Sequence, residues 1–94
     1  MNVKVRVPAA LRELCGGNGV LLLEVHDAAT VDEVLDALGG VHPALQRRVR
    51  DEQGTLRVHV NVFIGQDNIR SLEGASTRLR NGDELYVLPA VSGG

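Results

Sequence analysis

The sequence predicts an α+β domain in which a mixed sheet packs on one main helix. Three observations predict it. Apolar residues with a period of two, typical of half-buried strands, recur at residues 3–7, 56–64 and 84–88. Residues 30–38 carry the period of an amphipathic helix. The length of 94 residues, with 44% hydrophobic side chains, allows one modest core.

The first two strands are expected to form a hairpin with a long connection. Residues 2–7 alternate valine with polar side chains and end at a proline. Residues 9–14 can form a helical turn, and the glycine-rich cluster at 15–19 indicates a turn. The apolar run at 20–25 is short enough to be the second strand.

The main helix has a clear beginning and end in the sequence. Thr30 can cap its N-terminus, and Glu33, three residues later, completes a capping box. Gly39 and Gly40 are expected to stop it. Its apolar stripe falls at positions i, i+3, i+4 and i+7, namely Val31, Val34, Leu35 and Leu38.

A second, shorter helix is expected to begin at Pro43, because proline fits the first turn of a helix. Leu45 and Val49 would form its apolar edge. Three basic residues are expected to face the solvent: Arg47, Arg48 and Arg50. They could meet an acidic partner, but a solvated helix face is the more common explanation, and the adjacent Asp51 and Glu52 reduce their field.

The longest alternating run predicts a strand over residues 56–64, with His59 on its polar face. After a turn, residues 69–72 could pair briefly. Asn-Gly-Asp at 81–83 is a strong turn signal, and residues 84–88 form the last strand.

The order of these elements is that of a β-grasp, with the first and last strands adjacent and parallel in the centre of the sheet. We divide the chain into a β-grasp domain, residues 1–88, and an extended tail, residues 89–94.

Composition excludes several functions. A net charge of −2 and only two aromatic residues, Phe63 and Tyr86, argue against nucleic-acid binding. No apolar run approaches the 18 or so residues of a membrane-spanning helix, and residues 1–6 do not resemble a signal peptide. We therefore expect no membrane partner and a cytoplasmic location.

No set of residues has the spacing of a catalytic or metal site. Cys15, the single cysteine, is more typical of a small buried hydrophobe than of a nucleophile. Residues 16–19 lack the Lys-Ser/Thr of a phosphate-binding loop. No metal is expected at the three histidines, His26, His42 and His59. The sequence therefore does not predict an enzyme.

The end of the chain is the remaining candidate. Gly93 and Gly94 pack nothing and cost the most entropy to order. Following directly after a strand and Pro89, they complete a thin tail that could extend roughly 20 Å. Such a tail can thread a narrow channel and present its carboxylate to another enzyme, although a frayed terminus is the common alternative.

Motifs along nearly the whole chain resemble the ubiquitin-like sulfur carrier proteins. They are the Val-rich strand followed by Leu-Arg-Glu-Leu-Cys-Gly at 11–16, the capped helix at 30–35 with His-Pro-Ala-Leu at 42–45, and the end Leu-Arg-Asn-Gly-Asp-Glu-Leu-Tyr-Val-Leu-Pro-Ala-Val-Ser-Gly-Gly at 79–94. This group includes the thiamine-pathway carrier, the cysteine-biosynthesis carrier and the small subunit of molybdopterin synthase.

The resemblance implies that an E1-like adenylyltransferase/sulfurtransferase activates Gly94 with ATP and converts it to a thiocarboxylate. The carrier itself would bind no cofactor. The residues before Gly93 would contact the partner enzymes: Leu88, Pro89, Ala90, Val91 and Ser92. Leu88 could instead belong to the core, which strand alternation leaves open.

Within the family, the Leu-Pro-Ala-Val tail and the extra residues at 50–56 favour a carrier that supplies sulfur to a cysteine synthase. The first alternative is the small subunit of molybdopterin synthase, with the large subunit as the sulfur-accepting partner. A second is a ubiquitin-like modifier joined to lysines, and a third is a simple interaction module.

Overall fold

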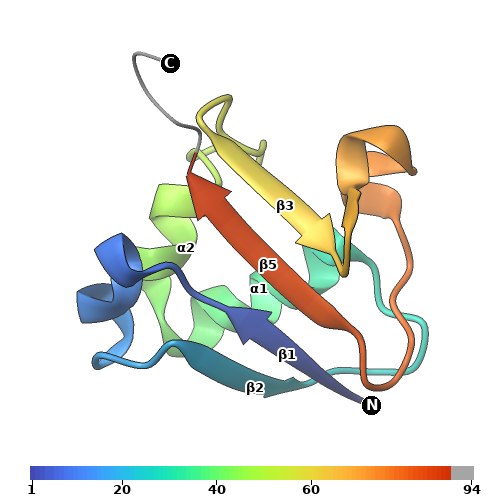
Figure 1. Ribbon diagram of the computed structural model, residues 1–94, viewed down its shortest axis with the longest axis horizontal. Helices are drawn as coiled ribbons and strands as arrows, with labels where there is room; N and C mark the ends of the chain where they lie inside the picture. Colours follow the sequence, from blue (N-terminus) through green and yellow to red (C-terminus); the bar gives the residue numbers. More distant parts are fainter. Residues whose placement is uncertain (90–94) are drawn as a thin grey trace.

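The computed structural model describes residues 1–89. Within them, one five-stranded sheet carries helices on one face (Figure 1). The strands are β1 (Asn2–Arg6), β2 (Val20–Glu24), β3 (Val60–Ile64), β4 (Asp67–Asn68) and β5 (Glu84–Pro89), in the spatial order β2-β1-β5-β3-β4. The helices are α1 (Val31–Val41) and α2 (Pro43–Val49), with short 3-10 helices η1 (Ala9–Cys15), η2 (Ile69–Ser71) and η3 (Gly74–Ser76).

Strand β5 lies at the centre of the sheet. It pairs in parallel with β1, where Val5 is opposite Leu85, and antiparallel with β3, where Val62 is opposite Val87. The predicted parallel central pair is thereby confirmed. The loop between β1 and β2 contains η1 and turns at Gly16 and Gly17, whose positive φ angles of 71° and 83° favour glycine.

The core is aliphatic and lies between the sheet and α1. The apolar stripe predicted for α1 is fully buried. It faces alternate residues of the strands, which are also buried: Val3, Val5, Leu21, Leu23, Val62, Leu85 and Val87. Each such side chain contributes roughly 1.5–3 kcal/mol by leaving water, so this layer supplies most of the favourable free energy.

The capping box at the start of α1 is confirmed. The Thr30 hydroxyl accepts a hydrogen bond from the Glu33 amide at 3.2 Å, and the Glu33 carboxylate accepts one from the Thr30 amide at 3.1 Å. The predicted stop was wrong, because α1 continues through Gly39 and Gly40 to Val41. A Cβ atom on Gly39 would lie 3.2 Å from Cγ of Gln46, so Gly39 permits the close approach of α2.

Arg50 does not face the solvent, as the sequence suggested. Its side chain is only 6% exposed and lies against α1. Its two terminal nitrogens contact Asp36 at 2.7 Å and Asp32 at 3.4 Å. Arg50 is therefore not part of an exposed basic cluster, because its ion pairs join the end of α2 to α1.

The strand predicted at residues 56–64 was wrong in its first half. Only residues 60–64 form β3, because the Val60 amide bonds to the Arg57 carbonyl in a turn. Val58 is 77% exposed, and His59 lies in this turn rather than on a strand. Val60 pairs with Pro89, the last residue of β5, whereas the residues before it contact the end of α2: Leu56 bridges to Arg50, and the Arg57 amide donates to the Val49 carbonyl.

The segment that follows β3 also differs from the prediction. Residues 69–71 form the 3-10 helix η2 instead of pairing, because the Asn68 side chain accepts a hydrogen bond from the Arg70 amide and caps it. The short strand β4 lies just before it. The last strand runs one residue beyond the predicted 84–88, to Pro89.

We expect stability to depend on pH through the ion pair of His26 and Glu33 at the start of α1. The hydrogen bond with Glu33 raises the pKa of His26 above 6.5, and the same bond lowers the pKa of Glu33 below 4.5. The pair is therefore fully formed between these two ordinary values. Its contribution is lost as pH rises through the raised pKa of His26, and as pH falls through the lowered pKa of Glu33.

Urea midpoints measured from pH 3 to 9 test this expectation. His26→Gln should remove the decline above about pH 6.5 and leave other pH effects in place. His59→Gln is the matched control, because His59 is exposed and lies far along the chain from α1. An unchanged pH profile in His26→Gln would contradict the assignment.

Candidate functional site

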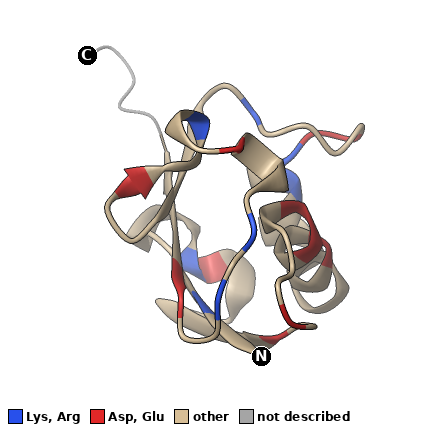
Figure 2. Cartoon of the chain, turned by 90° about the vertical axis from the view of Figure 1, so that its right-hand side faces the viewer, with Lys and Arg blue, Asp and Glu red and all other residues tan. Residues whose placement is uncertain are grey.

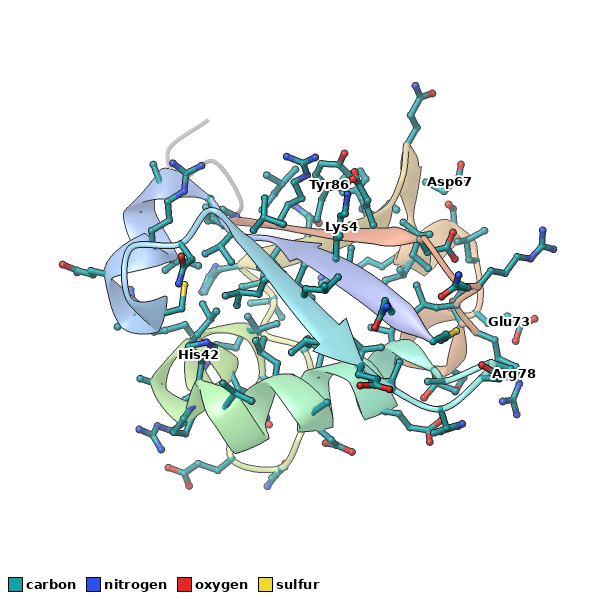
Figure 3. All side chains as sticks on the ribbon, turned by 90° about the horizontal axis from the view of Figure 1, so that it is seen from below. Lys4, His42, Asp67, Glu73, Arg78 and Tyr86 are labelled. Carbon is teal, nitrogen blue, oxygen red and sulfur yellow. The ribbon has the colours of Figure 1, made fainter. Side chains whose placement is uncertain are left out.

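The candidate site is the end of β5, from which the chain continues to Gly94. Leu85 and Val87 point into the core, whereas Tyr86 and Leu88 alternate onto the open face of the sheet. Figure 3 shows Tyr86 together with Lys4 on the side of the sheet opposite the helices. Leu88 is 43% exposed, so it is not a core residue and its side chain is accessible to a partner.

The structure places two of the predicted site residues side by side at the sheet's end. Leu88 pairs with Asn61, and the exposed Pro89 pairs with Val60. The other predicted site residues lie outside the described part of the chain: Ala90, Val91, Ser92, Gly93 and Gly94.

A hollow of about 320 Å³ lies beside Leu88. Two guanidinium groups border it, from Arg6 at the end of β1 and Arg12 in η1. Apolar side chains complete the wall: Val7, Pro8, Val20 and Leu88, with the ring of Tyr86.

A second hollow, of about 240 Å³, lies beside Pro89. It is bordered by Arg48 of α2 and by Arg57 and His59 of the turn before β3, with Leu11 and Val60 as apolar wall. Leu88 and Pro89 therefore each line one of two hollows, and both hollows combine apolar walls with arginines.

Arg6, Glu84 and Tyr86 form a polar network on the open face next to Leu88. The Arg6 guanidinium contacts the Glu84 carboxylate at 3.2 Å, and the Tyr86 hydroxyl donates to its other oxygen at 2.6 Å. The guanidinium also lies 5.9 Å from the centre of the Tyr86 ring, within the range of a cation–π contact. The network holds the side chains beside Leu88 in fixed positions.

This network is not suited to proton transfer near neutral pH. Hydrogen bonds from Tyr86 and then Arg6 lower the pKa of Glu84, and the bond to Glu84 raises the pKa of Tyr86 above 10. The carboxylate is therefore a weak base and the phenol a weak acid. Its chemistry fits recognition of a partner rather than catalysis.

The remaining sequence candidates lie apart from the end of β5. Cys15 is buried, and its thiol donates to the carbonyl oxygens of Arg12 and Asn18. His26 pairs with Glu33, and His42 links α1 to α2. Within residues 1–89, no three His, Cys, Asp or Glu side chains are arranged to hold a metal ion. Over the same residues, no helix has the length and apolar character needed to span a bilayer.

Sequence reasoning missed Arg6, Arg12 and Arg57 as neighbours of Leu88 and Pro89 at the end of β5. They belong to β1, η1 and the turn before β3, and only folding brings these segments together. Arg48 was noticed as part of a basic run, but its position beside Pro89 has no local signal in the sequence.

The sheet order, the parallel central pair and the helix across one face define a ubiquitin-like β-grasp domain. A chain of the crystal structure of the Amycolatopsis orientalis BexX/CysO complex superposes with a TM-score of 0.86 and 32% identity, covering 98% of this chain and 99% of that one. The predicted fold is thereby confirmed.

The model of the ThiS family matches residues 5–94, and the chain belongs to this family of ubiquitin-like sulfur carriers and small modifiers. It is 42% identical to small archaeal modifier protein 1 of Haloferax volcanii, over 92% of this chain and 93% of that protein. It is 29% identical to the sulfur carrier protein CysO of Mycobacterium tuberculosis, over the whole of both chains.

Proposed function

We propose that this protein carries sulfur on Gly94 for the synthesis of cysteine. The proposal is supported chiefly by the similarity to CysO over the full length of both chains, together with the Gly-Gly end of the sequence. The tail residues, from Leu88 to Ser92, would contact the enzymes that act on Gly94. We place this reaction in the cytoplasm, where ATP is available.

The chemistry requires two displacements at the chain end. The Gly94 carboxylate attacks the α-phosphorus of ATP and pyrophosphate leaves, which gives an acyl adenylate. Sulfide or a persulfide then attacks the acyl carbon, and AMP leaves with the electron pair of the broken bond. When a persulfide is the donor, a reductant must cleave the remaining S–S bond to release the thiocarboxylate.

The carrier supplies the terminus and a docking surface, and the partners supply catalysis. The activating partner would be an E1-like adenylyltransferase/sulfurtransferase, and the accepting partner a cysteine synthase. ATP is consumed by the activating enzyme, and the carrier binds no cofactor. On this proposal the protein is a co-substrate rather than an enzyme, and neither nucleic acid nor a membrane takes part.

The intact mass of the protein tests the proposal. After incubation with ATP, sulfide and an activating enzyme, we expect the exchange of one oxygen for sulfur at Gly94, and no exchange when ATP is omitted. After addition of a cysteine synthase with O-phosphoserine or O-acetylserine, the thiocarboxylate sulfur should displace phosphate or acetate, which gives a thioester between Gly94 and cysteine. Hydrolysis of this acyl bond by water should then release cysteine and restore the original mass. Sulfur transfer to a molybdopterin precursor, with no cysteine formed, would identify the molybdopterin synthase subunit instead.

Conjugation to proteins is the second candidate function, favoured by the 42% identity to a small archaeal modifier protein. It begins with the same adenylate, but a lysine amine then attacks the acyl carbon. Isopeptide-linked conjugates in a lysate, absent for a chain that lacks Gly94, would establish this use.

A further inference from the structure

The two hollows at the end of β5 are lined by positive charge, and Arg57 also borders a third hollow, which it shares with Asp51 and Glu52. Every charged side chain that lines either hollow beside Leu88 and Pro89 is an arginine: Arg6, Arg12, Arg48 and Arg57. We call these four residues the arginine collar. No carboxylate lines either hollow, and of these four arginines only Arg6 has a carboxylate partner among the described residues, Glu84.

This concentration is notable because the chain as a whole has a net charge of −2. Several acidic side chains are engaged elsewhere. Asp32 and Asp36 hold Arg50, and Glu33 holds His26. Figure 2, in which Asp and Glu are red, shows acidic residues along α1. The Asp51 carboxylate accepts hydrogen bonds from backbone amides in its own loop, at 2.9 and 3.0 Å.

Local hydrogen bonds orient two members of the collar. Nε of Arg12 donates to the Val7 carbonyl at 3.0 Å, and Nε of Arg57 donates to the Arg47 carbonyl at 2.8 Å. The terminal nitrogens of both guanidinium groups have no hydrogen-bond partner among residues 1–89 and can donate to a group of another molecule. A held guanidinium loses less side-chain entropy when it binds a carboxylate, and it can bind it through two parallel bonds.

We propose that the arginine collar docks a protein surface rich in Asp and Glu that surrounds the channel receiving the chain end. This rests on the proposed function, because that partner is an enzyme that acts on Gly94. Carboxylates facing the collar would pair with Arg12, Arg48 and Arg57, while the apolar walls of the hollows accept neighbouring side chains. Charge complementarity of this kind chiefly accelerates encounter and orients the partner.

An acidic protein fits these observations better than a nucleic acid. The arginines border hollows with apolar walls, which can accept the apolar side chains of a protein surface but have no counterpart in a phosphate backbone. The chain also has only two aromatic residues on which bases could stack.

A glutamate 20-mer tests the collar without any enzyme. At low salt, NMR shifts should concentrate at the collar and at Pro89, and Arg48→Gln/Arg57→Gln should weaken binding about tenfold. The matched control is Arg78→Gln/Arg80→Gln, which removes the same charge from exposed positions at the other end of β5. Shifts spread evenly over the surface, equal weakening by both double variants, or tighter binding of a 20-mer oligonucleotide would overturn the proposal.

The activating enzyme provides the second measurement. In ATP–pyrophosphate exchange, Arg48→Gln/Arg57→Gln should raise the KM for the carrier about tenfold with little change in kcat, and should flatten the salt dependence seen with the unchanged protein. Arg48→Lys/Arg57→Lys, which keeps the charge but loses the two parallel bonds, should give a KM between those of the glutamine variant and the unchanged protein. Equal KM values for all variants would overturn the docking role of the arginine collar but would not affect the proposed function as a sulfur carrier. If the glutamate peptide binds at the collar but Gly94 is never adenylated, the collar is supported as a binding site for acidic groups and the proposed function is overturned.

Discussion

Replacing Leu85 with alanine is expected to lower the free energy of unfolding by about 2–5 kcal/mol. Leu85 is fully buried in the central strand, between β1 and β3, and packs against the core beneath α1. The substitution removes apolar contacts and leaves a cavity that the paired strands on both sides cannot close. Because small domains are stable by only about 5–15 kcal/mol, the variant should be marginally folded.

Leu88→Ala is the matched control on the same strand. Its side chain is 43% exposed on the open face, so the loss should stay below about 1 kcal/mol. Urea unfolding of both variants, with the slope m compared to the unchanged protein, measures the difference. If Leu88→Ala were as destabilising as Leu85→Ala, Leu88 would have to be assigned to the core and removed from the docking surface.

Deleting Gly93 and Gly94 should abolish thiocarboxylate formation completely while leaving the unfolding midpoint unchanged. The shortened chain still ends in a carboxylate, on Ser92, but that group lies about 7 Å short of the original position when the chain is extended. It also carries a side chain where glycine had none. The core that determines stability lies within residues 1–89, so the fold should not respond.

Gly94→Ala separates the effect of length from that of the side chain. This variant keeps the position of the carboxylate and adds one methyl group, so a narrow channel should reduce the rate of adenylation without changing the stability. Intact mass and pyrophosphate exchange measure both variants. A thiocarboxylate on Ser92 of the shortened chain, formed at the original rate, would contradict the role assigned to the two glycines.

Elements with strong local signals were predictable from the sequence. The capping box of Thr30 and Glu33 is a contact between residues three apart, and the stripe of α1 repeats within a few turns. The turn at residues 81–83 and the strand that follows it have equally local causes. Such features depend on backbone geometry and burial of one face, which neighbouring residues decide.

The predictions that the structure contradicts share a different cause, which is contact with residues outside the segment that carries the pattern. Residues 56–59 alternate like a strand, but the pairing described between β3 and β5 begins at Val60, and Leu56 bridges to Arg50 at the end of α2 instead. Gly39 and Gly40 have the pattern of a helix stop, yet α1 continues because His42 still donates to the Leu38 carbonyl. Arg50 lies in a basic run but is buried, because α1 brings Asp32 and Asp36 to it.

The same division applies to the candidate site. The Gly-Gly end, the proline before it and the apolar Leu88 lie within one short segment, so the sequence alone was enough to propose them as the reactive end and its approach, which stays a prediction. Whether Leu88 belongs to the core or to the surface depends on which face of β5 packs against the core, and that face carries Leu85 and Val87. The arginine collar depended wholly on folding, because Arg6, Arg12, Arg48 and Arg57 come from four segments that meet only once β1, η1 and α2 pack around the central strand. Helix caps, turns and strand alternation depend on residues that are neighbours in the sequence. The positive charge at the end of β5 instead comes from residues that are distant in the sequence and that only folding brings together.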